Sequence, residues 1–282
     1  MKQQPKRALI VEGGGMRGSH SCGALMALVE NGFWEFEVVA ATSAGACTSA
    51  FLVSRQFDML PKIWTEHLHG TRFINYRNLT RRSSSLMDLD YLIDQVFANT
   101  APLNTQAIQE SSTQFYIVAT HCKTGKPKYF EGHTDPILPA LKASAALPIA
   151  YRQPVIIEND SYIDGGLSDA IPIQKAIEEG CEEIFVLLTR PKGYRKKSPL
   201  IDLMPAYYKK SFPLLAEEIR LRHQRYNTIV EKIETNDFPA RLRVIQPQEK
   251  PIASRMTTNL KKIKASILQG YQDANLVLKR NS

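Results

Sequence analysis

Residues 8–18 read Ala-Leu-Ile-Val-Glu-Gly-Gly-Gly-Met-Arg-Gly, and they indicate how the chain begins to fold. The first four are a short apolar run with basic residues before it and glycines after it, which is typical of a buried parallel strand. Residues 19–31 then carry apolar side chains at helical spacing and are followed by Gly32, a common helix stop. The order strand, glycine turn, helix predicts one unit of an α/β sheet.

The same order recurs along the chain. Residues 36–41 form a second expected strand, and a turn of small residues at 42–46 leads into a helix that begins at 47. We therefore predict a three-layer α/β/α fold with a mostly parallel central sheet. The other expected strands are residues 115–119, 184–188 and 242–245 with a hairpin of 155–157 and 162–163, and the other expected helices are 137–146, 173–179, 213–234 and 257–279.

The chain is long and apolar enough to bury a sizeable core. It has 282 residues, of which 43% are hydrophobic, and it contains neither an internal repeat nor a clear linker. We expect a single domain over residues 1–282, with a motif-bearing core at about 7–190 and a helical part at about 200–282. Two polar, basic segments, residues 71–85 and 191–199, are expected to be loops.

Three short motifs follow expected strands. The glycine run at residues 13–18 lets backbone N–H groups point into one small volume, and the following helix adds its positive end. Such a nest binds a negative oxygen, either of a phosphate or of an acyl transition state. By itself the motif also matches the fingerprint of a dinucleotide-binding protein.

The second motif is Ala41-Thr42-Ser43-Ala44-Gly45, and the third is Asp164-Gly165-Gly166. The second has the form of a nucleophile elbow, G-x-S-x-G, with alanine in the first position. The glycines of the third would leave the carboxylate unobstructed on a tight turn. An anion nest, an elbow serine and a strand-end carboxylate are the parts that an acyl hydrolase needs. The carboxyl ends of strands share one edge of an α/β sheet, so these parts can meet there.

The order and spacing of the motifs resemble the patatin-like phospholipase family, in particular its bacterial members. Residues 143–148, Ala-Ser-Ala-Ala-Leu-Pro, are similar to the family's A-S-x-A-x-P segment. Asp164-Gly165-Gly166 followed by Ile171-Pro172 is similar to its D-G-G-x-x-x-x-x-P continuation. The resemblance covers roughly residues 7–190.

The resemblance implies a lipid acyl hydrolase with a Ser–Asp dyad, which needs neither a cofactor nor a metal. Ser43 would form the acyl-enzyme and Asp164 would act as its base. The glycine loop would hold the oxyanion. The family residues of this oxyanion motif correspond to Gly13, Gly14, Gly15, Arg17, Gly18 and Ala44. The other matching residues are Thr42 and Gly45 of the elbow and Gly165 and Gly166 of the third motif.

Two residues, Ala41 and Asp164, raise physical questions about this assignment. Ala41 stands where the family has the first elbow glycine, and alanine would add strain of about 1 kcal/mol if that position had a positive φ. A free aspartate has a pKa near 4. Partial burial and a short hydrogen bond to Ser43 would have to make Asp164 an effective base.

Other interpretations of the protein's function are supported by fewer residues. A nucleotide-binding protein would need an acidic residue at the end of the second strand, where Ala41-Thr42-Ser43 stands, and no Gly-Lys-Ser or Gly-Lys-Thr follows the loop. A catalytically silent lipid-binding relative is the other alternative. Among the histidines, only His223 follows Asp164, and we interpret it as solvated surface. His20 follows the glycine loop directly, and a secondary active-site role is the alternative interpretation of this residue.

The basic composition favours an acidic partner. The net charge is +8, and without a recognisable nucleic-acid motif we expect contact with an anionic membrane surface rather than nucleic acid. The four cysteines are widely spaced, and neither a signal peptide nor a run of ~20 apolar residues is present, so we expect a cytoplasmic protein with buried thiols. The hypothesised membrane-docking residues are Lys196, Lys197, Tyr207, Tyr208, Lys209, Lys210 and Phe212.

Overall fold

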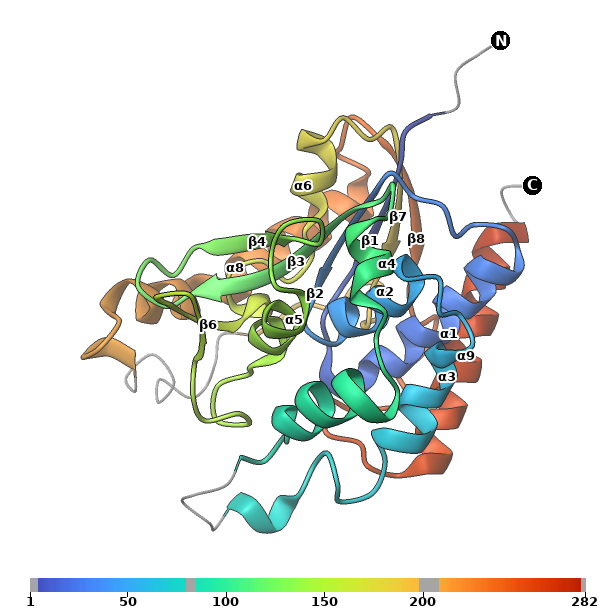
Figure 1. Ribbon diagram of the computed structural model, residues 1–282. Helices are drawn as coiled ribbons and strands as arrows, with labels where there is room; N and C mark the ends of the chain where they lie inside the picture. Colours follow the sequence, from blue (N-terminus) through green and yellow to red (C-terminus); the bar gives the residue numbers. More distant parts are fainter. Residues whose placement is uncertain (1–4, 80–84, 198–207, 280–282) are drawn as a thin grey trace.

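The computed structural model describes residues 5–79, 85–197 and 208–279 (Figure 1). Within these ranges the centre of the fold is one sheet with the strand order β5-β6-β3-β2-β1-β7-β8, and β4 pairs with β3 off this path. The strands are β1 (Arg7–Val11), β2 (Val38–Thr42), β3 (Gln114–His121), β4 (Pro127–Glu131), β5 (Val155–Ile157), β6 (Asp160–Asp164), β7 (Glu183–Leu187) and β8 (Arg241–Ile245).

The sheet is mostly parallel, as the sequence predicts. The five strands β3, β2, β1, β7 and β8 run parallel to one another, while β4, β5 and β6 are joined by antiparallel pairing. The expected hairpin is β5 and β6, with Glu158 at a φ of 57° in its turn. The chain turns to one side after β1 and to the other after β7, so the carboxyl ends of these neighbouring strands form a topological switch point.

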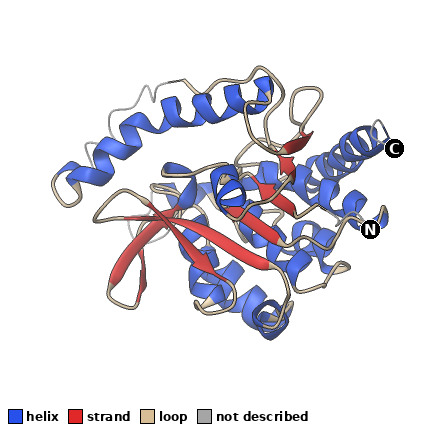
Figure 2. Ribbon diagram, turned by 90° about the horizontal axis from the view of Figure 1, so that it is seen from above, coloured by secondary structure: helices blue, strands red, loops and turns tan. Residues whose placement is uncertain are grey.

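Helices cover both faces of the sheet (Figure 2). The α-helices are α1 (Gly18–Glu30), α2 (Ala44–Val53), α3 (Met59–Lys62), α4 (Thr105–Gln109), α5 (Ile137–Ala145), α6 (Ile173–Glu178), α8 (Pro213–Thr235) and α9 (Leu260–Lys279). The shorter helical turns are the 3-10 segments η1 (Gly15–Arg17), η3 (Tyr76–Leu79) and η5 (Gly165–Leu167) and the π-helical segments η2 (Ile63–His67) and η4 (Asp90–Thr100).

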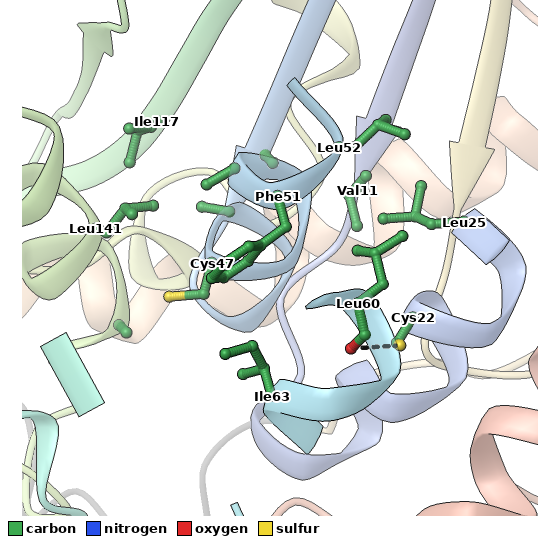
Figure 3. Packing of buried hydrophobic residues seen from close by; sticks show 14 of the residues in the cluster. Val11, Cys22, Leu25, Cys47, Phe51, Leu52, Leu60, Ile63, Ile117 and Leu141 are labelled. Carbon is green, nitrogen blue, oxygen red and sulfur yellow. Dashed lines mark hydrogen bonds between the residues drawn. The ribbon is translucent and has the colours of Figure 1, made fainter. Parts of the chain in front are cut away.

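Alternation along β1 divides the core into two layers. Leu9 and Val11 face a large cluster that includes α1, α2, α5 and α9, whereas Ala8 and Ile10 face a smaller one with α6 and α8. Figure 3 shows part of the larger cluster, in which Val11 lies among side chains of the neighbouring helices. Both faces of the sheet are therefore apolar, which is the three-layer arrangement that the sequence predicts.

The first and last long helices, α1 and α9, pack closely against each other (Figure 1). A Cβ added to Gly23 would lie 1.8 Å from the carbonyl oxygen of Ile267, and one added to Gly270 would lie 1.9 Å from that of His20. The same interface contains a buried hydrogen bond of 2.9 Å between His20 Nε2 and Asp273 Oδ2. Small residues thus allow a backbone contact that a methyl group would prevent.

Several elements were not expected from the sequence. Strand β4 has mostly exposed residues and begins at a proline, so it lacks the alternation that identifies a half-buried strand. Segment η4 and helix α4 were also missed. The expected loop at residues 71–85 contains η3 and Ile74, which forms a bridge with Met87 beyond it, while residues 80–84 lie outside the described chain. All four cysteines are buried free thiols.

Gly270→Ala should destabilise the fold by about 3 kcal/mol, the upper part of the range for overpacking. Alanine gains only about 1 kcal/mol in helix propensity over glycine, so the clash with the backbone of His20 dominates. Urea denaturation measures the change. The exposed Gln272→Ala on the same helix should change the free energy of unfolding by less than about 0.5 kcal/mol. Equal stability of both variants would contradict the close packing of α1 and α9.

Candidate active site

Ser43 lies in a strained turn between β2 and α2. Its φ of 56° and ψ of −127° are unusual for a residue with a side chain, and it is only 8% exposed. Ala41 lies within β2 and does not have a positive φ, so alanine adds no strain of the kind considered above. Gly45 is the residue of this turn that has no room for a side chain, because a Cβ there would lie 2.6 Å from the carbonyl oxygen of Val11. The turn therefore has the geometry of a nucleophile elbow.

The structure brings Ser43 and Asp164 together. Ser43 Oγ donates to Asp164 Oδ2 at 2.8 Å, and both side chains are buried. The register of β3 explains the contact, because Val118 pairs with Thr42 and the next residue, Ala119, pairs with Asp164. The other oxygen of the carboxylate accepts from the backbone N–H of Gly166 at 2.8 Å. Residues 121 positions apart are thus held in hydrogen-bonding contact by sheet pairing.

The segment at residues 143–148 holds both partners from the side of α5. Ser144 Oγ accepts from the backbone N–H of Ser43 at 2.7 Å and donates to the carbonyl oxygen of Val118 at 2.5 Å. The backbone N–H of Asp164 donates to the carbonyl oxygen of Ala146 at 3.0 Å. The sequence identifies this segment by its similarity to a family motif but does not predict its role. In the structure the segment holds the elbow and the carboxylate next to each other.

Burial raises the pKa of Asp164 above the ordinary value of an aspartate. The positive charge of Arg222 opposes this effect, as do the hydrogen bonds from Ser43 and from the N–H of Gly166. A raised pKa makes the carboxylate a stronger base than a free aspartate, which answers the question posed by the sequence.

The glycine loop lies next to the elbow at the carboxyl end of β1. It passes through η1 into α1, so the positive end of that helix faces the same region as the start of α2. In the described chain, the N–H groups of Gly14 and Gly15 have no hydrogen-bond acceptor, whereas the N–H of Met16 donates to the carbonyl oxygen of Arg255 at 2.9 Å. The loop therefore presents free donors beside Ser43.

Two cavities meet at Ser43. The first is almost entirely apolar and is formed by α2, the segment from α3 to Leu68, and η4; Figure 3 shows Cys47, Phe51, Leu60 and Ile63 from this region. Its lining includes Met16, Ala44, Cys47, Phe51, Leu60, Ile63, Trp64, Leu68, Phe73, Met87, Leu89, Leu92 and Phe97. The second is polar and contains the dyad, and its lining includes Glu12, Gly13, Gly14, Gly15, Arg17, Ser43, Asp164, Gly166, Lys196, Arg222 and Arg255.

Some residues lie elsewhere than the sequence predicts. His20 lines neither cavity and pairs with Asp273 between α1 and α9. The hypothesis that Tyr208 docks on a membrane is wrong, because Tyr208 is 5% exposed and packs in a core cluster. Lys196 is half-buried and lines the polar cavity. Tyr207 lies outside the described residues, and Phe212 is partly buried against the cluster of Tyr208.

The sequence missed the residues that the second half of the chain adds to the polar cavity. Lys196 follows β7, Arg222 lies on α8 and Arg255 precedes α9. Lys196 was expected only as a membrane-docking residue. No motif surrounds Arg222 or Arg255, so the excess of positive charge was the one indication of these two residues. His223, next to Arg222, lines neither cavity, and its Nδ1–H donates to the carbonyl oxygen of Arg220 at 3.1 Å, in keeping with its interpretation as a surface residue.

Comparison with known families agrees with the fold and the motifs. The model of the patatin-like phospholipase family matches residues 9–177, which is more than half of the chain. The chain therefore belongs to the patatin-like phospholipase family, as the sequence motifs indicate. Membership of this family supports a lipid-hydrolysing activity.

Individual proteins extend the comparison. The uncharacterized protein YjjU of Escherichia coli strain K12 is 32% identical over 192 residues, which are 67% of this chain and 53% of that protein. The chain thus spans about half the length of this relative. The crystal structure of VipD from Legionella pneumophila is similar with a TM-score of 0.51 and 14% identity, over 99% of this chain and 67% of that one. At this identity the likeness shows a common fold.

Arg222→Gln should move the acid limb of the activity profile to higher pH. Arg222 lowers the pKa of Asp164, so loss of its charge lets burial raise that pKa further. A base must be ionised to act, and activity therefore disappears at a higher pH as the solution is acidified. The measurement is kcat/KM against pH for a p-nitrophenyl ester.

The matched control is Arg220→Gln on the same helix. The side chain of Arg220 is 65% exposed and pairs with Glu217. Its charge is screened by solvent, so the acid limb should stay in place. An acid limb that moves equally in both variants, or in neither, would contradict the influence of Arg222 on Asp164.

Proposed function

We propose that the protein is a serine acyl hydrolase that cleaves carboxylic esters of lipids through an acyl-enzyme. The observation that carries the proposal is the hydrogen bond of 2.8 Å between Ser43 Oγ and Asp164 Oδ2, at the junction of an apolar and a polar cavity. Family membership supports the lipid substrate.

In the first half-reaction Ser43 attacks the ester carbonyl. Asp164 accepts the hydroxyl proton as the C–O bond forms and passes it to the alcohol that leaves. The negative charge that develops on the carbonyl oxygen is stabilised by the free N–H groups of Gly14 and Gly15, with the start of α2 at Ala44 adding its positive end.

In the second half-reaction water replaces the alcohol. Asp164 takes a proton from the water, which attacks the acyl-enzyme, and the proton then returns to Ser43 as the carboxylic acid leaves. These steps use one hydroxyl, one carboxylate and backbone donors, so we expect activity without calcium. Over the described ranges, no group of three or more His, Cys, Asp and Glu side chains could hold a metal ion, and no helix has both the length and the apolar character to cross a membrane.

The two cavities divide the substrate between them. The acyl chain enters the apolar cavity, because burial of its methylene groups is favourable by roughly 0.8 kcal/mol each. The alcohol part of the ester occupies the polar cavity, next to Asp164. Ser43 lines both cavities and is therefore in place to contact the bond between the two parts.

Ser43→Ala and Asp164→Asn should each lower kcat on p-nitrophenyl esters by at least about a thousandfold, since both groups act in the same step. Circular dichroism checks that the fold is intact. Full activity in Ser43→Ala would refute the proposal. A wild type that binds lipid vesicles but hydrolyses neither esters nor phospholipids would instead identify a silent lipid-binding relative.

Cys47→Phe should shift the acyl preference toward short chains. Cys47 lines the apolar cavity one helical turn beyond Ser43, and the larger ring would fill space that a long chain needs. We expect kcat/KM for a p-nitrophenyl ester of twelve carbons to fall relative to that for one of four carbons by about tenfold. Cys181→Ala, in the core on the other face of the sheet, is the control, and the ratio should stay the same. An unchanged ratio in Cys47→Phe would place the acyl chain elsewhere.

A further inference from the structure

The polar cavity carries more positive charge than the proposed chemistry uses. It is lined by four basic side chains and two carboxylates, which are Arg17, Lys196, Arg222 and Arg255 on one hand and Glu12 and Asp164 on the other. Two positive charges are thus left without an acidic counterpart in the cavity. The dyad needs only Asp164 and its hydrogen bonds, so this excess calls for a separate explanation.

The two carboxylates do not neutralise these cations by direct contact. Glu12 accepts from the backbone N–H and the hydroxyl of Thr189 at 2.7 and 3.0 Å, and from the hydroxyl of Tyr226 at 2.9 Å. Asp164 accepts from Ser43 and Gly166. In the described part of the chain, none of the four basic side chains forms an ion pair within 4.0 Å.

The segments that carry Lys196, Arg222 and Arg255 are nevertheless fixed by hydrogen bonds. The backbone of Lys196 exchanges hydrogen bonds of 2.7 and 2.9 Å with the side chain of Asn227, and its Nζ lies 3.5 Å from the centroid of the Tyr226 ring. Arg222 Nε donates to the carbonyl oxygen of Gly166 at 2.6 Å. Arg255 lies against the glycine loop through its carbonyl oxygen, which accepts from Met16 N–H. The charged groups of Lys196 and Arg222 are thus positioned before a ligand binds, which lowers the entropic cost of binding.

Arg17 adds an unused donor. It is 4% exposed, and in the described chain its buried Nε has no hydrogen-bond partner. A buried polar group without a partner is unfavourable, and a ligand with an acceptor in this cavity would satisfy it.

The surroundings of Lys196 disfavour its charged form. Burial and the nearby charge of Arg222 lower the pKa of Lys196 well below its ordinary value. Burial also lowers the pKa of Arg17 to about 10. An anion in the cavity would counter both effects and favour the charged form of Lys196.

We propose that this cavity binds the phosphate of the substrate, and that the preferred substrates are acylglycerols with a phosphate monoester headgroup. This inference rests on the proposed hydrolase activity. A phosphate monoester carries about −1.5 to −2 charges at neutral pH, which matches the excess of two positive charges better than the single charge of a phosphodiester. The short glycerol backbone joins ester and phosphate, so an ester bond at Ser43 leaves the phosphate in the same cavity.

Three of the four cations come from outside the family match. Lys196, Arg222 and Arg255 lie beyond residue 177, where the match ends. The proposed headgroup preference therefore rests mainly on this chain's second half, with Arg17 as the contribution of the family motifs. Arginine and lysine are both suited to phosphate, arginine through its fork of donors and lysine as a compact charge.

The test compares two substrates that differ only in the phosphate. Lysophosphatidate and the monoacylglycerol with the same acyl chain are hydrolysed in micelles of a neutral detergent, and the ratio of their kcat/KM values is measured. We expect the wild type to favour lysophosphatidate, and also to favour it over lysophosphatidylcholine. Lys196→Gln and Arg255→Gln should each lower the first ratio by about tenfold or more, mainly through KM, because each removes a charge-assisted hydrogen bond.

Two further variants separate charge from structure. Lys196→Arg keeps the charge and should recover much of the preference, which a merely structural role would not predict. Lys192→Gln removes an exposed charge in the same segment and should leave the ratio unchanged. A ratio near one in the wild type, or an equal ratio in wild type, Lys196→Gln and Arg255→Gln, would overturn the headgroup site.

The proposed function and the headgroup site can fail independently. Hydrolysis of a p-nitrophenyl ester that depends on Ser43, without a preference for lysophosphatidate, leaves the hydrolase standing and overturns only the headgroup site. Inorganic phosphate should inhibit that hydrolysis in the wild type and much less in Arg255→Gln. Inhibition by phosphate without preference for the phosphorylated lipid would mean that the cavity binds free phosphate, and the lipid headgroup proposal would be wrong.

Discussion

The hydrogen bond between Ser43 and Asp164 is the contact on which the candidate site depends, and it places strict demands on the sheet. Two residues far apart in sequence must reach the same point within 2.8 Å. Strand β3 meets this demand because it pairs with β2 along its first part and with β6 beyond the end of β2. Ser144 then ties the elbow to the carbonyl of Val118 on the same strand. A shift of one residue in this register would turn Asp164 to the other face.

Burial of the dyad has consequences for its surroundings. A buried carboxylate favours its protonated form, and the raised pKa of Asp164 follows from this. The basic residues of the polar cavity limit the effect and at the same time create an excess of positive charge. The proposed catalytic base and the proposed headgroup site are therefore linked by electrostatics, since Arg222 acts on Asp164 and lines the cavity where the phosphate would lie.

Strands β1, β2, β3 and β7 could be predicted because each contains a continuous apolar run. The same is true of α8 and α9, whose apolar spacing is regular over many residues. Strand β4 could not be predicted, because its residues are mostly exposed and only pairing with β3 makes it a strand. Segment η4 carries apolar residues at roughly helical spacing, but it lies in a region where the neighbouring polar residues suggested loops.

The sequence alone determined the family, the parallel α/β core and the identity of the three motifs, because each depends on residue types at short spacing. Local chemistry also restricts the elbow and the glycine loop, where small residues are required by close backbone contacts. Tertiary structure decided that Ser43 and Asp164 touch, that His20 belongs to a helix interface, and that Lys196, Arg222 and Arg255 surround the dyad. These features depend on strand register and on the packing of α8 and α9. The residues that meet there are far apart along the chain, and no repeating pattern in the sequence indicates that they will be neighbours.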